Sequence, residues 1–207
     1  MRVVIPMVGL ACAALASASH AQIWNEHGDA GSLPGTAQIT TGVGPLHEIR
    51  GTIGGAEDMY CIRVTNVHDF LASTVHGAEF DSQLWLFNAV GRGRAFCDDA
   101  ASGVFQSTIS GQFLHEGGVY MLAITQYNND ALDGDGRLLW NDTPYIGERA
   151  PDGPGAANII RRWTGMPEEP LRAYTIFLRG ATFCEVPVPG SLSVLSVAAL
   201  AGLRRRR

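Results

Sequence analysis

The chain contains no lysine, and its basic residues are outnumbered through most of its length. All 20 acidic residues lie between Glu26 and Glu185, where only ten arginines oppose them, so this stretch carries a formal charge of −10. A protein that binds nucleic acid needs a basic face to neutralise phosphates. We therefore exclude nucleic acid as a partner and keep cations and neutral ligands as candidates.

Catalytic signatures are absent from the sequence as well. It has no GxSxG, HExxH or P-loop motif, and GRGRAF at 91–96 lacks the third glycine of a dinucleotide-binding loop. No histidine has a second histidine at i, i+4. Asp98 and Asp99 could supply a general acid and a general base, but neighbours on a strand point to opposite faces. The sequence therefore predicts a protein without catalysis.

The sequence has four cysteines, with no CxxC pair and no histidine close to a cysteine, which argues against a zinc–thiolate site. Cys12 belongs to the N-terminal segment. The other three, Cys61, Cys97 and Cys184, allow one disulfide in an oxidising compartment, with three possible pairings. Among these pairings we favour Cys61 with Cys97.

No apolar run reaches the roughly 20 residues that a membrane-spanning helix needs, but each end of the chain carries a short one. Residues 1–21 contain Arg2, a mostly apolar stretch over 3–16, and Ser19 and Ala21 flanking one residue in a small-x-small pattern. This layout predicts a secretory signal peptide that is cleaved after Ala21.

At the other end, residues 192–203 are apolar or small at every position except two serines, and as a helix they would rise only about 18 Å. A cationic cluster just beyond an apolar segment tends to stay cytoplasmic while the rest of the chain is exported. We therefore expect residues 186–207 to be held briefly in the membrane and residues 22–185 to work outside the cell. The cationic cluster consists of Arg204, Arg205, Arg206 and Arg207.

Long amphipathic helix patterns are missing too, and period-two alternation of apolar and polar residues recurs instead. In residues 82–88 both faces are apolar, which is typical of a central strand. The pattern predicts an all-β fold, a single antiparallel β-sandwich or jelly roll with little helix. The expected strands lie within 46–53, 58–67, 70–75, 82–93, 94–97, 108–113, 117–127 and 173–183.

Residues 128–169 do not fit this pattern, because they are rich in Gly, Pro, Asp and Asn. Ile146 and three aromatic residues, Trp140, Tyr145 and Trp163, are expected to fix this long loop to the sandwich. Long loops on a rigid scaffold often carry binding functions. We therefore take Trp140, Tyr145 and Trp163 as a candidate ligand face for an extracellular polysaccharide; the alternative is a packed loop without a ligand.

Several stretches together resemble the bacterial pre-peptidase C-terminal domain family: 26–31 (EHGDAG), 49–64, 80–93, 97–100 (CDDA), 117–128 and 174–181. The resemblance implies a small non-catalytic β-sandwich of exported proteins, which in some members binds calcium and polymeric ligands. It places the calcium ligands on acidic residues of the N-terminal segment and just before the strand at 58–64. In this sequence these are Glu26, Asp29, Glu57 and Asp58.

Acidic side chains and amides also occur in other turns, and oxygen ligands are what calcium prefers. None of these segments has the order of an EF-hand loop, and acidic residues in turns are most often solvated or in Asx turns. A calcium site is therefore one alternative and a solvated surface is the other. The further segments contain Asp98 and Asp99, and Asn129, Asp130, Asp133 and Asp135.

The C-terminal segment resembles the PEP-CTERM sorting signal, which combines a Pro-x-Pro motif, a short apolar helix and an arginine cluster. Pro187 and Pro189 match the motif, although Val188 stands where the usual glutamate would be. The resemblance implies processing by an exosortase and release or attachment at the cell surface.

These observations predict an exported, non-catalytic binding or adhesion module of the cell surface or extracellular matrix. Two alternatives stay open. A secreted hydrolase, or its accessory domain, would need a concave site with two convergent carboxylates or a His–carboxylate pair. A structural coat subunit would show a large apolar or edge-strand face for self-association.

Overall fold

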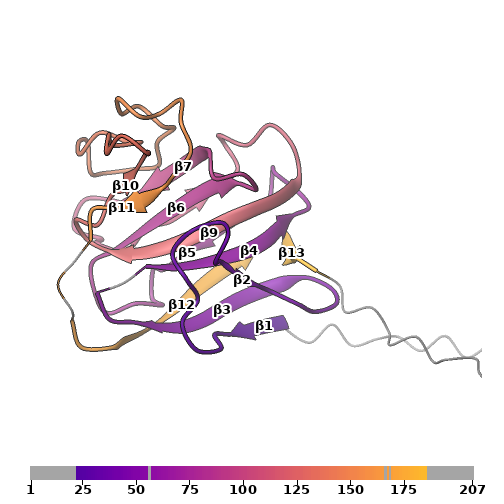
Figure 1. Cartoon of the computed structure of the whole chain (residues 1–207). Coiled ribbons are helices and arrows are strands. Elements are labelled where there is room, and N and C mark those ends of the chain that lie inside the picture. Colours follow the sequence, from indigo (N-terminus) through magenta and orange to yellow (C-terminus); the bar gives the residue numbers. More distant parts are fainter. Residues whose placement is uncertain (1–21, 56, 166, 168, 186–207) are drawn as a thin grey trace, which may run out of the picture.

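The computed structural model describes residues 22–55, 57–165, 167 and 169–185 (Figure 1). The predicted signal peptide, residues 1–21, and the predicted sorting segment with Pro187, Pro189 and Arg204–Arg207 lie outside the described residues. Within them, no residue is helical, and no helix long and apolar enough to cross a membrane is found there. The all-β prediction is confirmed.

Two sheets stack face to face, with a small hairpin on top of the second (Figure 1). Most neighbouring strands are antiparallel, and the parallel pairs of the described chain are β1 with β3 and β2 with β4. Sheet one has the order β1 (Gln22–Asn25), β3 (Leu46–Ile53), β12 (Arg172–Arg179), β5 (Leu71–Ser73), β8 (Thr108–Ser110). Sheet two has the order β13 (Ala181–Phe183), β4 (Asp58–Val64), β9 (Gly118–Gln126), β6 (Ser82–Asn88), β7 (Gly93–Cys97). The short strand β2 (Gln38–Ile39) also pairs with β4. The hairpin consists of β10 (Ala131–Leu132) and β11 (Arg162–Trp163).

The main core lies between the two sheets, where the alternation in the sequence places it. On β6, Leu84 and Leu86 point inward and are completely buried. They face a row of aliphatic residues from β3 and β12 that includes Ile49 and Ile176. The inward-facing residues of the two sheets include Leu46, Ile49, Ile53, Ala72, Ile109, Tyr174, Ile176 and Leu178 on one side and Tyr60, Ile62, Val64, Leu84, Leu86, Tyr120, Leu122 and Ile124 on the other.

The outer face of sheet two is also buried, because the segment after β9 folds back over it. Figure 1 shows β10 and β11 lying against β6 and β7 on the side away from β12. The ring of Trp85 on β6 has its centroid 5.4 Å from Trp140 and 5.5 Å from Trp163, both edge to face. Residues 128–165 are therefore a packed third layer, which confirms that Trp140 and Trp163 fix this segment to the sandwich. The same expectation for Tyr145 and Ile146 is wrong, because their side chains are exposed.

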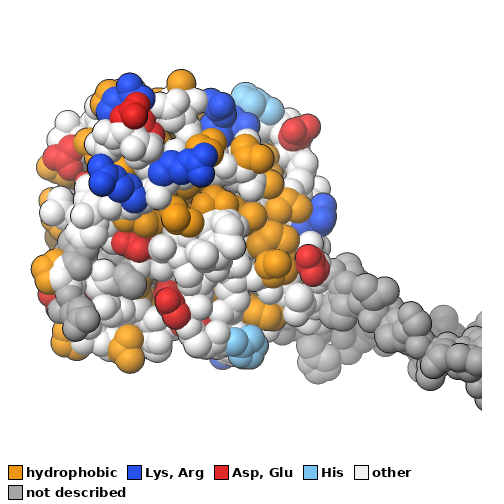
Figure 2. All heavy atoms as spheres, in the orientation of Figure 1, with side chains coloured by type: hydrophobic (Ala, Val, Ile, Leu, Met, Phe, Trp, Pro, Cys, Tyr) orange, Lys and Arg blue, Asp and Glu red, His pale blue; other side chains and the backbone are white. Residues whose placement is uncertain are grey.

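A hydrogen-bonded aspartate organises this third layer. Asp133 is 1% exposed, and its carboxylate accepts hydrogen bonds from the backbone N–H groups of Asp135 and Arg137, both at 2.9 Å. The Arg137 guanidinium, at 2.9 Å, and the Asn158 amide, at 2.7 Å, complete its surroundings. Figure 2 shows arginine side chains gathered over this end of the molecule.

Between β12 and β13 the chain passes from sheet one to sheet two at a single glycine. Gly180 separates β12 from β13 and has a φ of +66°, which favours glycine. A side chain there would place its Cβ 2.7 Å from the Asn66 carbonyl oxygen. The Gly180 carbonyl also accepts the Thr65 N–H at 2.8 Å. Gly180 thus lets one continuous segment close the sandwich.

The disulfide joins Cys61 to Cys184, with a Cα–Cα distance of 5.5 Å, so the predicted pairing of Cys61 with Cys97 is wrong. Cys61 lies on the outer face of β4, whereas Cys97 faces the main core from β7. Two strands, β9 and β6, also separate β4 from β7 in the sheet. Cys184 directly follows β13, which pairs with β4, and this brings it next to Cys61.

Candidate functional site

Three of the four predicted calcium ligands converge on one place. Glu26, Asp29 and Asp58 each offer a carboxylate oxygen, and these oxygens lie within 4.8 Å of one another. Glu26 directly follows β1, Asp29 lies in the turn beyond it, and Asp58 opens β4. The parallel ladder between β1 and β3 and the stacking of the two sheets bring these segments together. This group is called the N-terminal carboxylate cluster.

Hydrogen bonds fix two of these carboxylates in place. The two oxygens of Glu26 accept the backbone N–H groups of Ala30, at 3.2 Å, and of Thr52, at 2.8 Å. Asp58 Oδ2 accepts the Tyr174 hydroxyl at 2.7 Å, and the Tyr174 and Tyr60 hydroxyls lie 2.6 Å apart. Thr52 and Tyr174 belong to sheet one, Tyr60 belongs to sheet two, and Ala30 lies in the N-terminal turn. The cluster therefore connects the two sheets and this turn.

The electrostatics of the cluster are unfavourable for three charged carboxylates. Burial raises the pKa of Asp58 to about 7; the hydrogen bond from Tyr174 lowers it, and the charges of Glu26 and Asp29 raise it. Burial also raises the pKa of Glu26. Among the described residues, no arginine or histidine forms an ion pair with any member of the cluster. A cation bound here would relieve this repulsion.

The cluster opens to solvent through a pocket of about 490 Å³, which Gly28, Thr52 and Leu171 help to line. Its donors are oxygen atoms only, which suits a hard cation such as calcium. The fourth predicted ligand, Glu57, is not part of the group. Its Oε1 instead accepts a hydrogen bond from the Asn129 amide at 2.6 Å.

The other acidic segments do not join this cluster. The carboxylate of Asp133 is saturated by its hydrogen bonds, which lower its pKa, the backbone N–H of Arg137 most strongly. Asp98 and Asp99, by contrast, meet Asp81 in a second group whose oxygens also lie within 4.8 Å of one another. The expectation that Asp98 and Asp99 point apart is therefore wrong, because β7 ends at Cys97 and the alternation ends with it.

The predicted aromatic ligand face is only partly at the surface. Trp140 is 2% exposed and Trp163 is 8% exposed, so neither can contact a ligand. Their apolar rings cover the outer face of β6 instead. Tyr145 is 41% exposed and is the one member of the predicted face that stays accessible. Sequence reasoning missed this because burial of the two tryptophans depends on tertiary packing.

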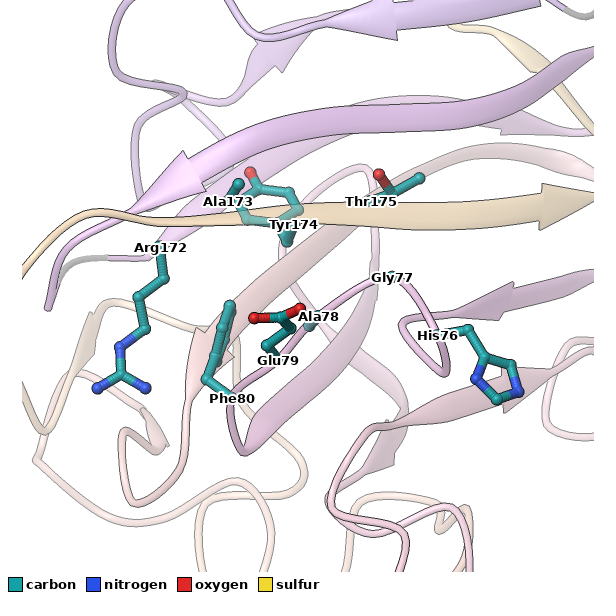
Figure 3. Close-up of a pocket in the computed structure, with 9 residues that line it drawn as sticks. All are labelled: His76, Gly77, Ala78, Glu79, Phe80, Arg172, Ala173, Tyr174 and Thr175. Carbon is teal, nitrogen blue, oxygen red and sulfur yellow. The ribbon is translucent and has the colours of Figure 1, made fainter.

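A cavity of about 640 Å³ lies beside the start of β12 (Figure 3). Glu79 and Arg172 line it, together with His76. Figure 3 shows the His76 imidazole at the far end of the cavity, pointing away from the Glu79 carboxylate. The cavity therefore does not present these two residues as the His–carboxylate pair that a hydrolase would need.

No protein-family model, curated protein or solved structure matches the chain. The resemblances to the pre-peptidase C-terminal domain and to the PEP-CTERM signal therefore stay predictions.

Proposed function

We propose that the chain is an exported, non-catalytic binding or adhesion module of the cell surface or extracellular matrix, and that its N-terminal carboxylate cluster binds calcium. The observation that carries this proposal is the convergence of Glu26, Asp29 and Asp58 on one solvent-facing pocket. When bound, calcium would neutralise the three carboxylates. Glu26 and Asp58 would then hold β1 against β4 without mutual repulsion.

The disulfide supports the exported location. Disulfides persist in oxidising compartments and are rare in the cytosol of most organisms. Cys61 and Cys184 are both largely buried, at 4% and 8% exposure, so the bond belongs to the folded core. Export by the predicted signal peptide, and exosortase processing with transient membrane retention at residues 186–207, are part of the same proposal.

An extracellular polysaccharide is the ligand class that we propose for the module. The support is an exposed aromatic group around Tyr145, which shares a pocket with Phe105 and Tyr127. Phe105 is 55% exposed and Tyr127 is 44% exposed. Aromatic rings with a polar end can stack on a sugar and hydrogen-bond to it. On an immobilised extracellular polysaccharide that retains the wild-type protein, the Tyr145→Ala variant should no longer be retained. Unchanged retention of the variant would count against this ligand face.

Thermal unfolding with calcium or with EDTA tests the calcium part of the proposal. A ligand at 100 times its dissociation constant adds about 2.7 kcal/mol to the free energy of unfolding. We expect calcium to raise the Tm of the wild type, and Asp58→Asn to lose the part of that shift that the N-terminal carboxylate cluster provides. Asp69→Asn, which changes an exposed aspartate outside both carboxylate groups, should keep it. Equal Tm values in calcium and in EDTA for the wild type would contradict a calcium site.

A further inference from the structure

The second carboxylate group lies where two neighbouring strands meet one edge of sheet two. Asp81 directly precedes β6, and Asp98 and Asp99 directly follow β7. Because β6 and β7 are antiparallel and Leu84 pairs with Cys97, the start of β6 and the end of β7 lie side by side. The strand pairing therefore brings three carboxylates together. This group is called the β6–β7 carboxylate cluster.

Backbone hydrogen bonds hold this cluster in a rigid frame. The Asp81 carbonyl accepts the Tyr127 N–H at 3.0 Å, which joins the cluster to the end of β9. Asp99 exchanges two bonds with the third layer: its N–H donates to the Tyr145 carbonyl at 3.1 Å, and its carbonyl accepts the Gly147 N–H at 2.8 Å. The Asp98 carbonyl accepts the Ser107 hydroxyl at 2.8 Å. Three other segments of the chain, around Ser107, Tyr127 and Tyr145, thus fix the positions of the carboxylates.

Two oxygen atoms of the cluster are enclosed but have no hydrogen-bond partner among the described residues. They are Oδ1 of Asp98 and Oδ1 of Asp81. Asp98 is only 3% exposed, so water does not solvate it freely. A buried carboxylate oxygen without a partner is costly, and native proteins usually satisfy such groups. This distinguishes the cluster from an ordinary group of acidic residues at the surface.

The cluster lines a pocket of about 260 Å³ whose other walls are Phe105, Tyr127 and Tyr145. No arginine or histidine of the described chain forms an ion pair with the three carboxylates. The donors offered to the pocket are carboxylate oxygens, with neither thiol nor imidazole among them. Such a donor set suits a hard divalent cation and not a soft metal.

We propose that Asp81, Asp98 and Asp99 form a second divalent-cation site, for an ion of the calcium type, separate from the N-terminal carboxylate cluster. The cation would satisfy the enclosed oxygens of Asp81 and Asp98 and balance the three negative charges. Asp99, which is half-buried, would complete the protein ligands on the solvent side. The exposed rings of Tyr127 and Tyr145 then border the bound ion.

A proton shared between carboxylates is the competing explanation for the unpartnered oxygens. Burial raises the pKa of Asp98 to about 7 and that of Asp81 to about 6, in both cases with a contribution from neighbouring carboxylates. A proton shared between these carboxylates is therefore lost once the pH lies well above these two pKa values. Measurements at pH 8 separate the two explanations, because a cation site binds more strongly there, whereas a proton-sharing pair has ionised.

The test is the number of calcium ions bound per chain, measured by isothermal titration calorimetry with CaCl2 at pH 8 after treatment with EDTA. We expect two ions for the wild type and one for Asp98→Asn. Asp81→Asn provides a second variant in case Asp98→Asn does not fold, and near-UV circular dichroism checks folding of both. Asp69→Asn is the matched control and should bind two ions.

Asp58→Asn separates this proposal from the proposed function, because it changes only the N-terminal cluster. If the β6–β7 site exists, this variant still binds one ion, and adding Asp98→Asn removes it. A wild type that binds one ion or none, with no loss on changing Asp98 or Asp81, overturns the second site. Loss of an ion in Asp98→Asn but not in Asp58→Asn would keep the second site and refute the first.

Discussion

The two faces of sheet two are both buried, but they are buried by different means. The inner face packs aliphatic residues such as Leu86 and Leu122 against a regular sheet. The outer face packs Trp85 and Phe87 against residues 128–165, which form only two short strands. Regular strands can fill the space between two flat faces with branched side chains, whereas an irregular segment needs a few large rings to cover the same area. The outer layer therefore depends on few residues.

Trp163→Ala should have the largest effect and would break the outer layer selectively. The indole is 8% exposed, packs on Trp85, and donates a hydrogen bond to the Ser32 carbonyl at 2.7 Å. A buried Trp→Ala change costs about 3–5 kcal/mol. Urea unfolding measures this loss, and limited proteolysis should show cleavage first within 128–165.

Trp163→Phe is the matched variant, because it keeps a ring but removes the hydrogen bond, and we expect a loss of about 1–2 kcal/mol. If Trp163→Ala left both stability and the cleavage pattern unchanged, the outer layer would not depend on this anchor and the comparison of the two faces would fail.

The disulfide also lies on the outer face, and it should contribute a comparable amount to the free energy of unfolding. Cys184→Ser opens a loop whose ends are 123 residues apart in sequence. For such a loop the chain-entropy model gives a loss of roughly 4–5 kcal/mol, and measured losses are typically about 2–5 kcal/mol. The urea midpoint of the variant should match that of the reduced wild type. A variant as stable as the oxidised wild type would show that the bond adds nothing to the fold.

The pH dependence of stability should separate two kinds of carboxylate by sign, those whose pKa rises on folding and those whose pKa falls. In the absence of calcium, the unfolded chain releases the Asp58 proton near pH 4, but the folded protein holds it to about pH 7. Stability from this group is therefore present at low pH and is lost, by a few kcal/mol at most, as the pH rises from about 4 to 7. Asp81 and Asp98 act in the same direction.

Asp133 in the outer layer has the opposite sign, because its pKa is lowered on folding. Its contribution is present above pH 4 and is lost as the pH falls below that value. In EDTA, Asp58→Asn should reduce the loss of stability between pH 4 and 7, and Asp133→Asn should reduce the loss below pH 4. Urea midpoints across pH 2–8 measure both, and slopes that neither variant changes would contradict the assigned groups.

The inner core could be predicted from the sequence, but the outer layer could not. Alternation assigns Tyr60, Ile62 and Val64 to one face of β4 without knowledge of any partner strand. The segment over the outer face has no period, so its contacts with Trp85 and Phe87 follow only from the assembled fold. The same reason explains why the predicted pairing of Cys61 with Cys97 is wrong. The alternation of residues along a strand does not predict which strands are neighbours in the sheet.

The candidate sites divide in a similar way. Glu26, Asp29 and Asp58, which the resemblance to a known family implies as calcium ligands, lie near one another, whereas Glu57 lies outside the group. Their role in binding calcium stays a prediction. Asp81 was missed, because a single aspartate before a strand is a common turn residue. The pairing of β6 with β7 gives it a role, and the sequence offers no local pattern that predicts which strands pair.

The position of Cys184 has a mechanical consequence. It lies at the end of the described chain, and its sulfur is bonded to Cys61 in the middle of β4. A load applied to the chain at Glu185 therefore passes through a covalent bond into the interior of sheet two, and the hydrogen bonds of β13 do not have to bear it. If the mature protein is held to the cell by its C-terminal end, this bond protects the sandwich from being peeled open from its last strand.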